Sequence, residues 1–142
     1  MTSRPLTLAE AEFIAHWLAV ELMNSENEPI PPFETRHEGK LESCLAAPFQ
    51  TFGGKYIYRT FAEKAAALFY LITKDHCFVN GNKRMAVTLT LVLCYMNKKW
   101  IDINPMELYE VACNVAKSNP RDRDEVHRIL VELFKIKIVA RA

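Results

Sequence analysis

The chain has 142 residues with a formal net charge of +1, and half of them are hydrophobic. This length and composition predict one soluble globular domain over residues 1–142, which needs neither a disulfide nor a metal ion to fold. The near-zero charge argues against direct nucleic-acid binding, and the longest apolar stretch, Val87 to Met96, is too short to cross a membrane.

The cysteines and the N-terminus indicate the cellular compartment. Four cysteines are spread along the chain without paired spacing, which argues against a zinc site or a disulfide framework. Met1 to Leu8 lacks the apolar core of a signal peptide. We therefore expect a cytoplasmic protein, in which Cys77 is a packing thiol rather than a nucleophile.

The N-terminal third predicts two helices joined by an extended segment. Thr7 and Glu10 form a capping-box pattern, which predicts a helix from Leu8 to Met23. Three prolines predict an extended connection over Ser25–Phe33, and a second helix is expected over Arg36–Ala46. The expected buried stripe of the first helix is Leu8, Ala11, Ile14, Leu18 and Leu22.

A β-hairpin is predicted next, from Phe49 to Tyr58. Two short β-prone runs flank the pair Gly53-Gly54, which is typical of a tight hairpin turn. A lone hairpin is marginally stable in water, so this one needs support from helices or from a bound partner.

The remaining segments predict an all-α bundle. We expect helices over Phe61–His76, Gly81–Met96, Pro105–Ser118 and Asp122–Lys135, with a short extended piece at Trp100–Asp102. The helix from Gly81 is apolar almost all round and is therefore predicted to be the central helix of the bundle.

The polar segment between the two most apolar helices is the candidate site. The unpaired N–H groups at a helix start near Gly81 attract an anion, and Lys83 and Arg84 add positive charge. The expected anion is a phosphate chain. His76 precedes it, and a histidine can accept a proton from an attacking hydroxyl near neutral pH.

The motif His-x-Phe-x-Asn-Gly-Asn-Lys-Arg, from His76 to Arg84, resembles the signature of the Fic/Doc superfamily in its death-on-curing (Doc) form. The similarity extends upstream through Gln50–Gly54, Tyr58 and Glu63–Leu68, and downstream through Met96-Asn97. It covers roughly residues 41–117. It implies a compact Fic/Doc-type helical bundle around the motif helix, with the hairpin as a flap over the active site. The alternative for this segment is an ordinary surface hairpin.

The resemblance also implies roles for individual residues. The catalytic residues would be His76 as base, with Lys83 and Arg84 binding phosphate charge. Asn80 would be the Mg²⁺ ligand, at a position where many family members carry a carboxylate. The implied nucleotide-binding residues are Phe78, Gly81, Asn82, Lys83 and Arg84. The implied target-docking flap residues are Phe52, Gly53, Gly54, Lys55 and Tyr56.

Two reactions are compatible with this family. Fic-type enzymes transfer a nucleotide monophosphate to a protein hydroxyl, whereas Doc-type toxins resemble them in fold and act as kinases with ATP and Mg²⁺. The Fic pattern has glycine in place of Lys83 and arginine in place of Val87, so this chain favours phosphoryl transfer. The implied partners are the elongation factor that delivers aminoacyl-tRNA, as target, and a neutralising antitoxin. The alternatives are AMP transfer on the same scaffold and a catalytically silent module that binds a peptide or an antitoxin.

Overall fold

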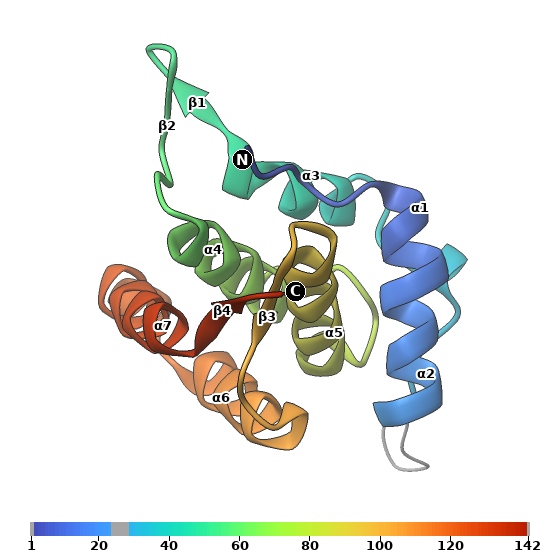
Figure 1. Ribbon diagram of the computed structural model, residues 1–142. Coiled ribbons are helices and arrows are strands. Elements are labelled where there is room, and N and C mark those ends of the chain that lie inside the picture. The colour runs from blue at the N-terminus through green and yellow to red at the C-terminus, as the bar shows by residue number, and fades with distance from the viewer. Residues whose placement is uncertain (1, 24–28, 142) are drawn as a thin grey trace.

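The computed structural model describes residues 2–23 and 29–141. It is a helical bundle with two small antiparallel sheets (Figure 1). The helices are α1 (Leu8–Glu10), α2 (Trp17–Met23), α3 (Lys40–Ala46), α4 (Phe61–Lys74), α5 (Asn82–Met96), α6 (Pro105–Lys117) and α7 (Arg123–Lys137). The strands are β1 (Thr51–Phe52), β2 (Lys55–Tyr56), β3 (Lys99–Ile101) and β4 (Ile138–Ala140). The predicted all-α class with a small hairpin is confirmed.

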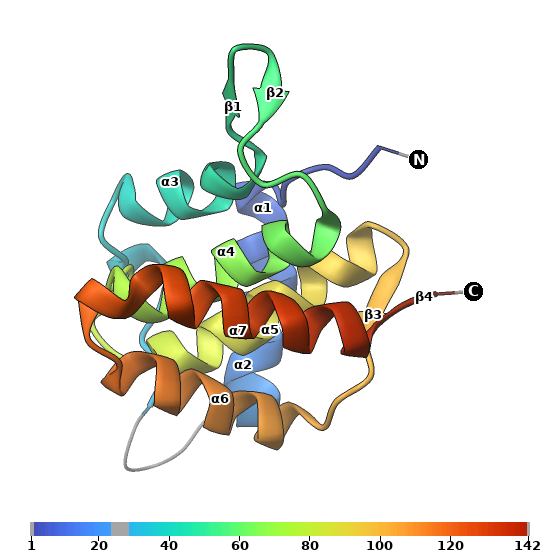
Figure 2. The ribbon, with the colours of Figure 1, turned by 90° about the vertical axis from the view of Figure 1, so that its left-hand side faces the viewer.

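Helix α5 is the centre of the bundle. Every residue from Met85 to Cys94 is buried, as its all-round apolar sequence predicts. It packs against α4, α6 and the N-terminal helical region, while α7 packs against α4 (Figures 1 and 2). The start of α5 is therefore fixed by the core of the protein.

The N-terminal helix differs from its prediction in two ways. A π-helical segment, Ala11–His16, separates α1 from α2. Its buried face consists of Ala11, Ala15 and Ala19, whereas Leu22 is 75% exposed. Ala11 is buried as predicted, but Leu8 and Leu22 of the predicted stripe are exposed, because three alanines at four-residue spacing let the helix pack closely against α5.

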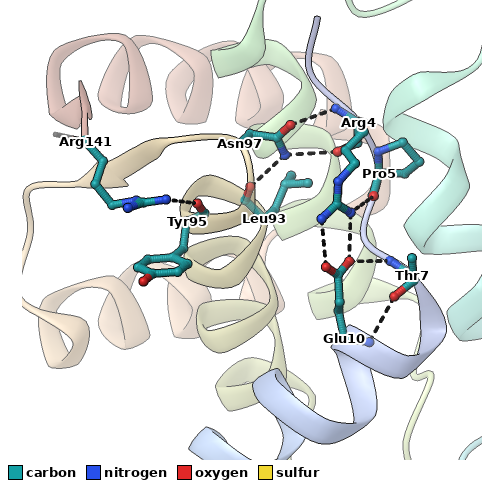
Figure 3. Close-up of polar contacts among 8 residues, drawn as sticks. All are labelled: Arg4, Pro5, Thr7, Glu10, Leu93, Tyr95, Asn97 and Arg141. Carbon is teal, nitrogen blue, oxygen red and sulfur yellow. Dashed lines mark hydrogen bonds and ion pairs between the residues drawn. The ribbon is translucent and has the colours of Figure 1, made fainter.

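Both chain ends are tied to the last turn of α5 (Figure 3). The Asn97 side chain accepts a hydrogen bond from the Arg4 N–H at 2.7 Å and donates to the Arg4 carbonyl at 3.0 Å. The Arg141 guanidinium donates to the Tyr95 carbonyl at 2.9 Å. The Arg4 guanidinium also forms a bidentate ion pair with the Glu10 carboxylate. This carboxylate also accepts a hydrogen bond from the Thr7 N–H.

Helix α3 begins later than predicted. The predicted helix starts at Arg36, but a 3-10 turn occupies Phe33–Thr35 and α3 starts only at Lys40. Gly39 has φ +87°, a left-handed conformation that interrupts a helix and that glycine adopts at no steric cost. The expected extended connection lies partly outside the described residues, and no regular structure is present from 29 to 32.

The other elements follow the sequence closely, with one addition. The hairpin forms with Thr51 opposite Tyr56 and with the two glycines in its turn. The extended piece at residue 100 is β3, and it pairs with β4 in the C-terminal tail, for which the sequence predicted no strand. Among residues 2–23 and 29–141, no helix is long and apolar enough to span a membrane.

Candidate active site

The motif loop joins the end of α4 to the start of α5. Helix α4 ends at Lys74, two residues before the predicted end, and His76 follows in a left-handed conformation with φ +50°. Positive φ values are uncommon outside glycine, although histidine is among the residues that tolerate them. This turn leaves the His76 side chain exposed at the end of the helix.

Contacts of two residues, Phe78 and Asn82, fix the motif loop. The Phe78 ring is 1% exposed and packs against Phe33 and His16, with centroids 6.1 and 6.4 Å away. The Asn82 Oδ1 accepts the Phe78 N–H at 3.0 Å, and its Nδ2 donates to the Phe78 carbonyl at 2.9 Å. Phe78 and the Asn82 side chain therefore hold the loop in shape.

The first turn of α5 is open to an anion. Gly81 caps the helix with φ +77° and without a side-chain hydrogen bond. The N–H groups of a first helical turn have no partner within the helix, and anions commonly bind there. A Cβ atom at Gly81 would lie 3.2 Å from Ile30 Cγ1. The position therefore suits glycine both for its backbone conformation and for space.

His76 and the start of α5 line one cleft of about 220 Å³. The wall of the cleft comprises Thr73, His76, Val79, Asn80, Gly81, Asn82, Lys83, Arg84 and Ala116. Six of the seven predicted motif residues are among them, and only Phe78 is not. Phe78 was predicted to bind nucleotide, but its ring is buried in the core beneath the loop.

The sequence did not point to three of the wall residues. Thr73 lies in the last turn of α4, three residues before His76 in the sequence. Val79 occupies a variable position of the motif. Ala116 comes from α6, where the Lys74 ammonium donates to the Ala116 and Ser118 carbonyls and so holds the end of α6 beside the cleft.

The two motif cations are half-buried on the wall of the cleft. The Arg84 guanidinium carbon lies 5.2 Å from the centroid of the Tyr109 ring, a cation–π contact with α6. Lys83 and Arg84 are consecutive, so both project from the first turn of α5. Together with the helix dipole they make this cleft favourable for phosphate.

The side chain of Asn80 offers an oxygen ligand to a metal ion in the cleft. Its Oδ1 accepts the Gly81 N–H at 2.9 Å, and a carbonyl oxygen retains a second lone pair. No group of three or more His, Cys, Asp or Glu side chains in the described parts of the chain could hold a metal. The single amide oxygen of Asn80 fits Mg²⁺, because this ion keeps several waters and is commonly bound through substrate phosphates.

The hairpin lies away from this cleft. It precedes the N-terminal end of α4, whereas His76 follows the C-terminal end, and a helix of 14 residues spans about 21 Å (Figure 2). Phe52, Gly53, Gly54, Lys55 and Tyr56 are all exposed, and none of them lines the cleft. The structure therefore does not bring the predicted docking residues to His76.

A buried lysine supports the base of the hairpin instead. Lys64 is 3% exposed, and its ammonium donates to the Tyr58 and Arg59 carbonyls and lies 4.2 Å from the centroid of the Tyr56 ring. Burial lowers the pKa of this ammonium. The hairpin thus obtains from α4 the support that its short strands require.

Comparisons with known proteins agree with the motif. The model of the Fic/DOC family matches residues 6–94. The protein named Toxin Doc from Mycolicibacterium smegmatis (strain ATCC 700084 / mc(2)155) is 33% identical over 64 residues, which are 45% of this chain and 49% of that protein. The match thus spans about half the length of that relative, and no solved structure gives a significant match. Since the family model covers more than half of the sequence and includes the motif, the chain belongs to the Fic/Doc family.

Proposed function

We propose that this protein transfers the terminal phosphoryl group of ATP, or of another nucleoside triphosphate, to a hydroxyl of a target protein. One observation carries the proposal: His76, Lys83, Arg84 and the open first turn of α5 line a single cleft. Membership of the Fic/Doc family supports it, because proteins of this family use nucleoside triphosphates and modify protein hydroxyls.

The size of the cleft favours phosphoryl over nucleotidyl transfer. At about 220 Å³ it is smaller than the roughly 300–1,000 Å³ of sites that enclose a drug-sized ligand. It suits a phosphate group better than a whole nucleotide. The nucleoside would then lie outside, and the terminal phosphate would lie beside His76, as the Lys83-Arg84 pair already suggests.

In the proposed reaction the hydroxyl oxygen of the target attacks the γ-phosphorus. The bond between this phosphorus and the β,γ-bridging oxygen breaks, and ADP leaves with the electron pair. His76 takes the hydroxyl proton on a ring nitrogen. Lys83, Arg84 and the N–H groups of the first α5 turn stabilise the charge on the phosphate oxygens, which is the main help a protein gives this reaction.

Asn80 would hold Mg²⁺ through its side-chain oxygen. Bound there, the ion would neutralise part of the charge of the phosphate chain. Since an amide oxygen is uncharged, the phosphates would contribute most of the affinity for the ion. We expect a weaker metal site than a carboxylate would give.

The biological role that we propose is that of a Doc-like toxin. It rests on the family and on the relative named Toxin Doc. The proposed target is a threonine of the elongation factor that delivers aminoacyl-tRNA, with a separate antitoxin as the controlling partner. The exposed hairpin is proposed to contact the target at a distance from the reacting hydroxyl.

Labelled ATP tests the reaction. The protein is incubated with Mg²⁺ and the purified bacterial elongation factor, using ATP labelled in either the γ- or the α-phosphate. Phosphoryl transfer predicts label on the factor from the γ-phosphate alone, with a mass gain of one phosphate. Label from the α-phosphate would instead mean nucleotidyl transfer, and the absence of both would contradict the proposed reaction with this target.

A further inference from the structure

Two buried cysteines meet between helix α3 and the motif loop. Cys44 lies in α3, Cys77 directly follows His76, and the two cysteines are 2% and 0% exposed. Their sulfur atoms are 3.5 Å apart, and the Cys44 thiol also lies 3.5 Å from a carboxylate oxygen of Asp75. The proposed phosphoryl transfer uses neither thiol.

Two hydrogen bonds hold the start of α3 beside the motif loop and keep the two cysteines close. The His37 N–H donates to the Cys77 carbonyl at 2.8 Å, and the Lys40 ammonium donates to the Asp75 carbonyl at 3.3 Å. The sulfur atoms of a disulfide are about 2 Å apart. From their separation of 3.5 Å, the two thiols therefore need to approach each other by only about 1.5 Å to form one.

The surroundings give the two thiols different reactivities. The hydrogen bond with Cys44, together with the positive charge of Lys40, lowers the pKa of the Cys77 thiol. The hydrogen bond with Cys77, together with burial, raises the pKa of the Cys44 thiol. Because the thiolate is the form that an oxidant attacks, Cys77 is the first of the two to react.

We infer that Cys44 and Cys77 form a reversible redox switch, in which oxidation to a disulfide draws the motif loop towards α3 and displaces His76. Its effect on activity rests on the proposed function. His76 is the residue before Cys77, and a displacement of about 1 Å at a reacting group can slow a reaction about 100-fold. Lys83 and Arg84 belong to α5, which the core fixes, so the affinity for ATP should not change.

A peroxide is the oxidant that the switch requires. The Cys77 thiolate attacks one oxygen of hydrogen peroxide, the O–O bond breaks, and hydroxide leaves, which gives a sulfenic acid. Cys44 then gives its proton to the Asp75 carboxylate, and its sulfur attacks the Cys77 sulfur, so that the S–S bond forms and a second hydroxide leaves. The two thiols lose two electrons, and their two protons convert the two hydroxides into water.

A cavity beside the cysteines gives a small oxidant a route to them. Its volume is about 590 Å³, and its lining includes Asp75 together with Ser43 and His76, the sequence neighbours of the two cysteines. Disulfides in reducing compartments are usually transient and redox-sensing, which agrees with the cytoplasmic location that we expect.

Peptide mass mapping of the wild type after treatment with hydrogen peroxide tests whether the disulfide forms. We expect a cross-linked pair of peptides that contain Cys44 and Cys77, and dithiothreitol should separate them. Cys94 is the internal control, because it is also fully buried and burial raises its pKa to about 12. It should remain a thiol. If the peroxide leaves Cys44 and Cys77 unlinked, the inference is overturned.

Nuclear magnetic resonance of the imidazole C–H groups tests the effect on His76 without any substrate. The His76 signals should move when the disulfide forms and return after reduction. The His127 signals are the control and should stay in place, because the His127 ring packs against Tyr58 at the base of the hairpin. Unchanged His76 signals in the cross-linked protein would overturn the inference.

Steady-state transfer to the purified elongation factor, measured after removal of the peroxide, tests the effect on activity. Oxidation should slow transfer by the wild type at least about tenfold, with unchanged ATP affinity, and dithiothreitol should restore it. Cys44→Ser should keep its own rate after the same treatment. The control Cys113→Ser, at a partly exposed position of α6, should be slowed like the wild type.

Equal transfer by the reduced and the cross-linked wild type would overturn the inference, and so would equal slowing of Cys44→Ser. If the reduced wild type transfers nothing to this factor, the proposed function fails. The cross-link and the His76 signals then still decide whether the two cysteines control the position of the histidine.

Discussion

The side-chain amide of Asn82 forms two hydrogen bonds with the main chain of Phe78, at 3.0 and 2.9 Å. The bonds bridge the loop between His76 and α5. Asn82, which the motif predicts to bind phosphate, thus has its side chain engaged in closing the loop. Its backbone N–H, in the first turn of α5, is what it offers to an anion.

The variant Asn82→Ala should destabilise the protein. It removes both bonds and leaves the Phe78 N–H and carbonyl without these partners, which costs about 1–3 kcal/mol. Urea denaturation measures the free energy of unfolding, and hydrogen exchange of the Phe78 amide reports the loop itself. Asn114→Ala, on the exposed face of α6, is the control and should change neither. An equally protected Phe78 amide in Asn82→Ala would show that the side chain does not close the loop.

Alanine in place of Gly81 should be more damaging than alanine in place of Gly39. Both glycines have positive φ, at +77° and +87°, so both substitutions strain the backbone. A Cβ at Gly81 would also lie 3.2 Å from Ile30 Cγ1, whereas nothing lies within 4 Å at Gly39. Thermal unfolding of the two variants isolates the effect of this contact. Equal melting temperatures of Gly81→Ala and Gly39→Ala would contradict the predicted difference.

The variant Lys83→Met should weaken ATP binding by about 10- to 100-fold. A hydrogen bond to a charged group contributes about 1.5–3 kcal/mol, and methionine keeps most of the apolar length of lysine. Calorimetric titration with ATP and Mg²⁺ measures the change. Lys135→Met is the control, because Lys135 lies on α7 in an exposed ion pair with Glu132. Equal ATP affinity in Lys83→Met and the wild type would exclude Lys83 from the phosphate site.

The ion pair of Arg4 and Glu10 should make stability depend on pH in acid. Hydrogen bonding to the Arg4 guanidinium lowers the pKa of Glu10 from 4.5 to about 2. Because the pKa of Glu10 is lower in the folded state, the ionised carboxylate stabilises the folded protein fully above pH 4.5. This contribution is lost as the pH falls towards 2. Because Arg4 is 44% exposed, we expect only about 1 kcal/mol.

Urea denaturation of the wild type and of Glu10→Gln between pH 2 and 7 measures that contribution. The difference in unfolding free energy should be largest above pH 5 and should vanish near pH 2. Glu125→Gln is the control, since Glu125 and Arg128 form an ion pair at the surface with both side chains about 60% exposed. If the difference in unfolding free energy between the wild type and Glu10→Gln does not vary with pH, the lowered pKa of Glu10 is contradicted.

Local patterns in the sequence predicted most of the fold. Capping residues located the starts of α1, α4 and α6, and the apolar run behind Gly81 identified α5 as the central helix. Two of the failures have non-local causes. The alanine face at Ala11, Ala15 and Ala19 is buried because α5 lies against it, and β4 forms because β3 is beside it. Neither partner can be inferred from the segment itself.

The site could be predicted as far as the motif is contiguous. His76 and the residues from Asn80 to Arg84 line one cleft because nine consecutive residues join two core helices. Ala116 comes from a distant part of the chain, and only the packing of α6 brings it to the cleft. The hairpin directly precedes α4, so its position at the other end of this helix follows from the order of the elements in the sequence.

Transfer of the γ-phosphate by the wild type and by His76→Ala tests the central claim most directly. Both proteins are incubated with Mg²⁺, γ-labelled ATP and the purified elongation factor, and ATP affinity is measured in parallel. The account predicts that His76→Ala folds and binds ATP like the wild type but transfers no detectable label. Transfer by His76→Ala at the wild-type rate would contradict it.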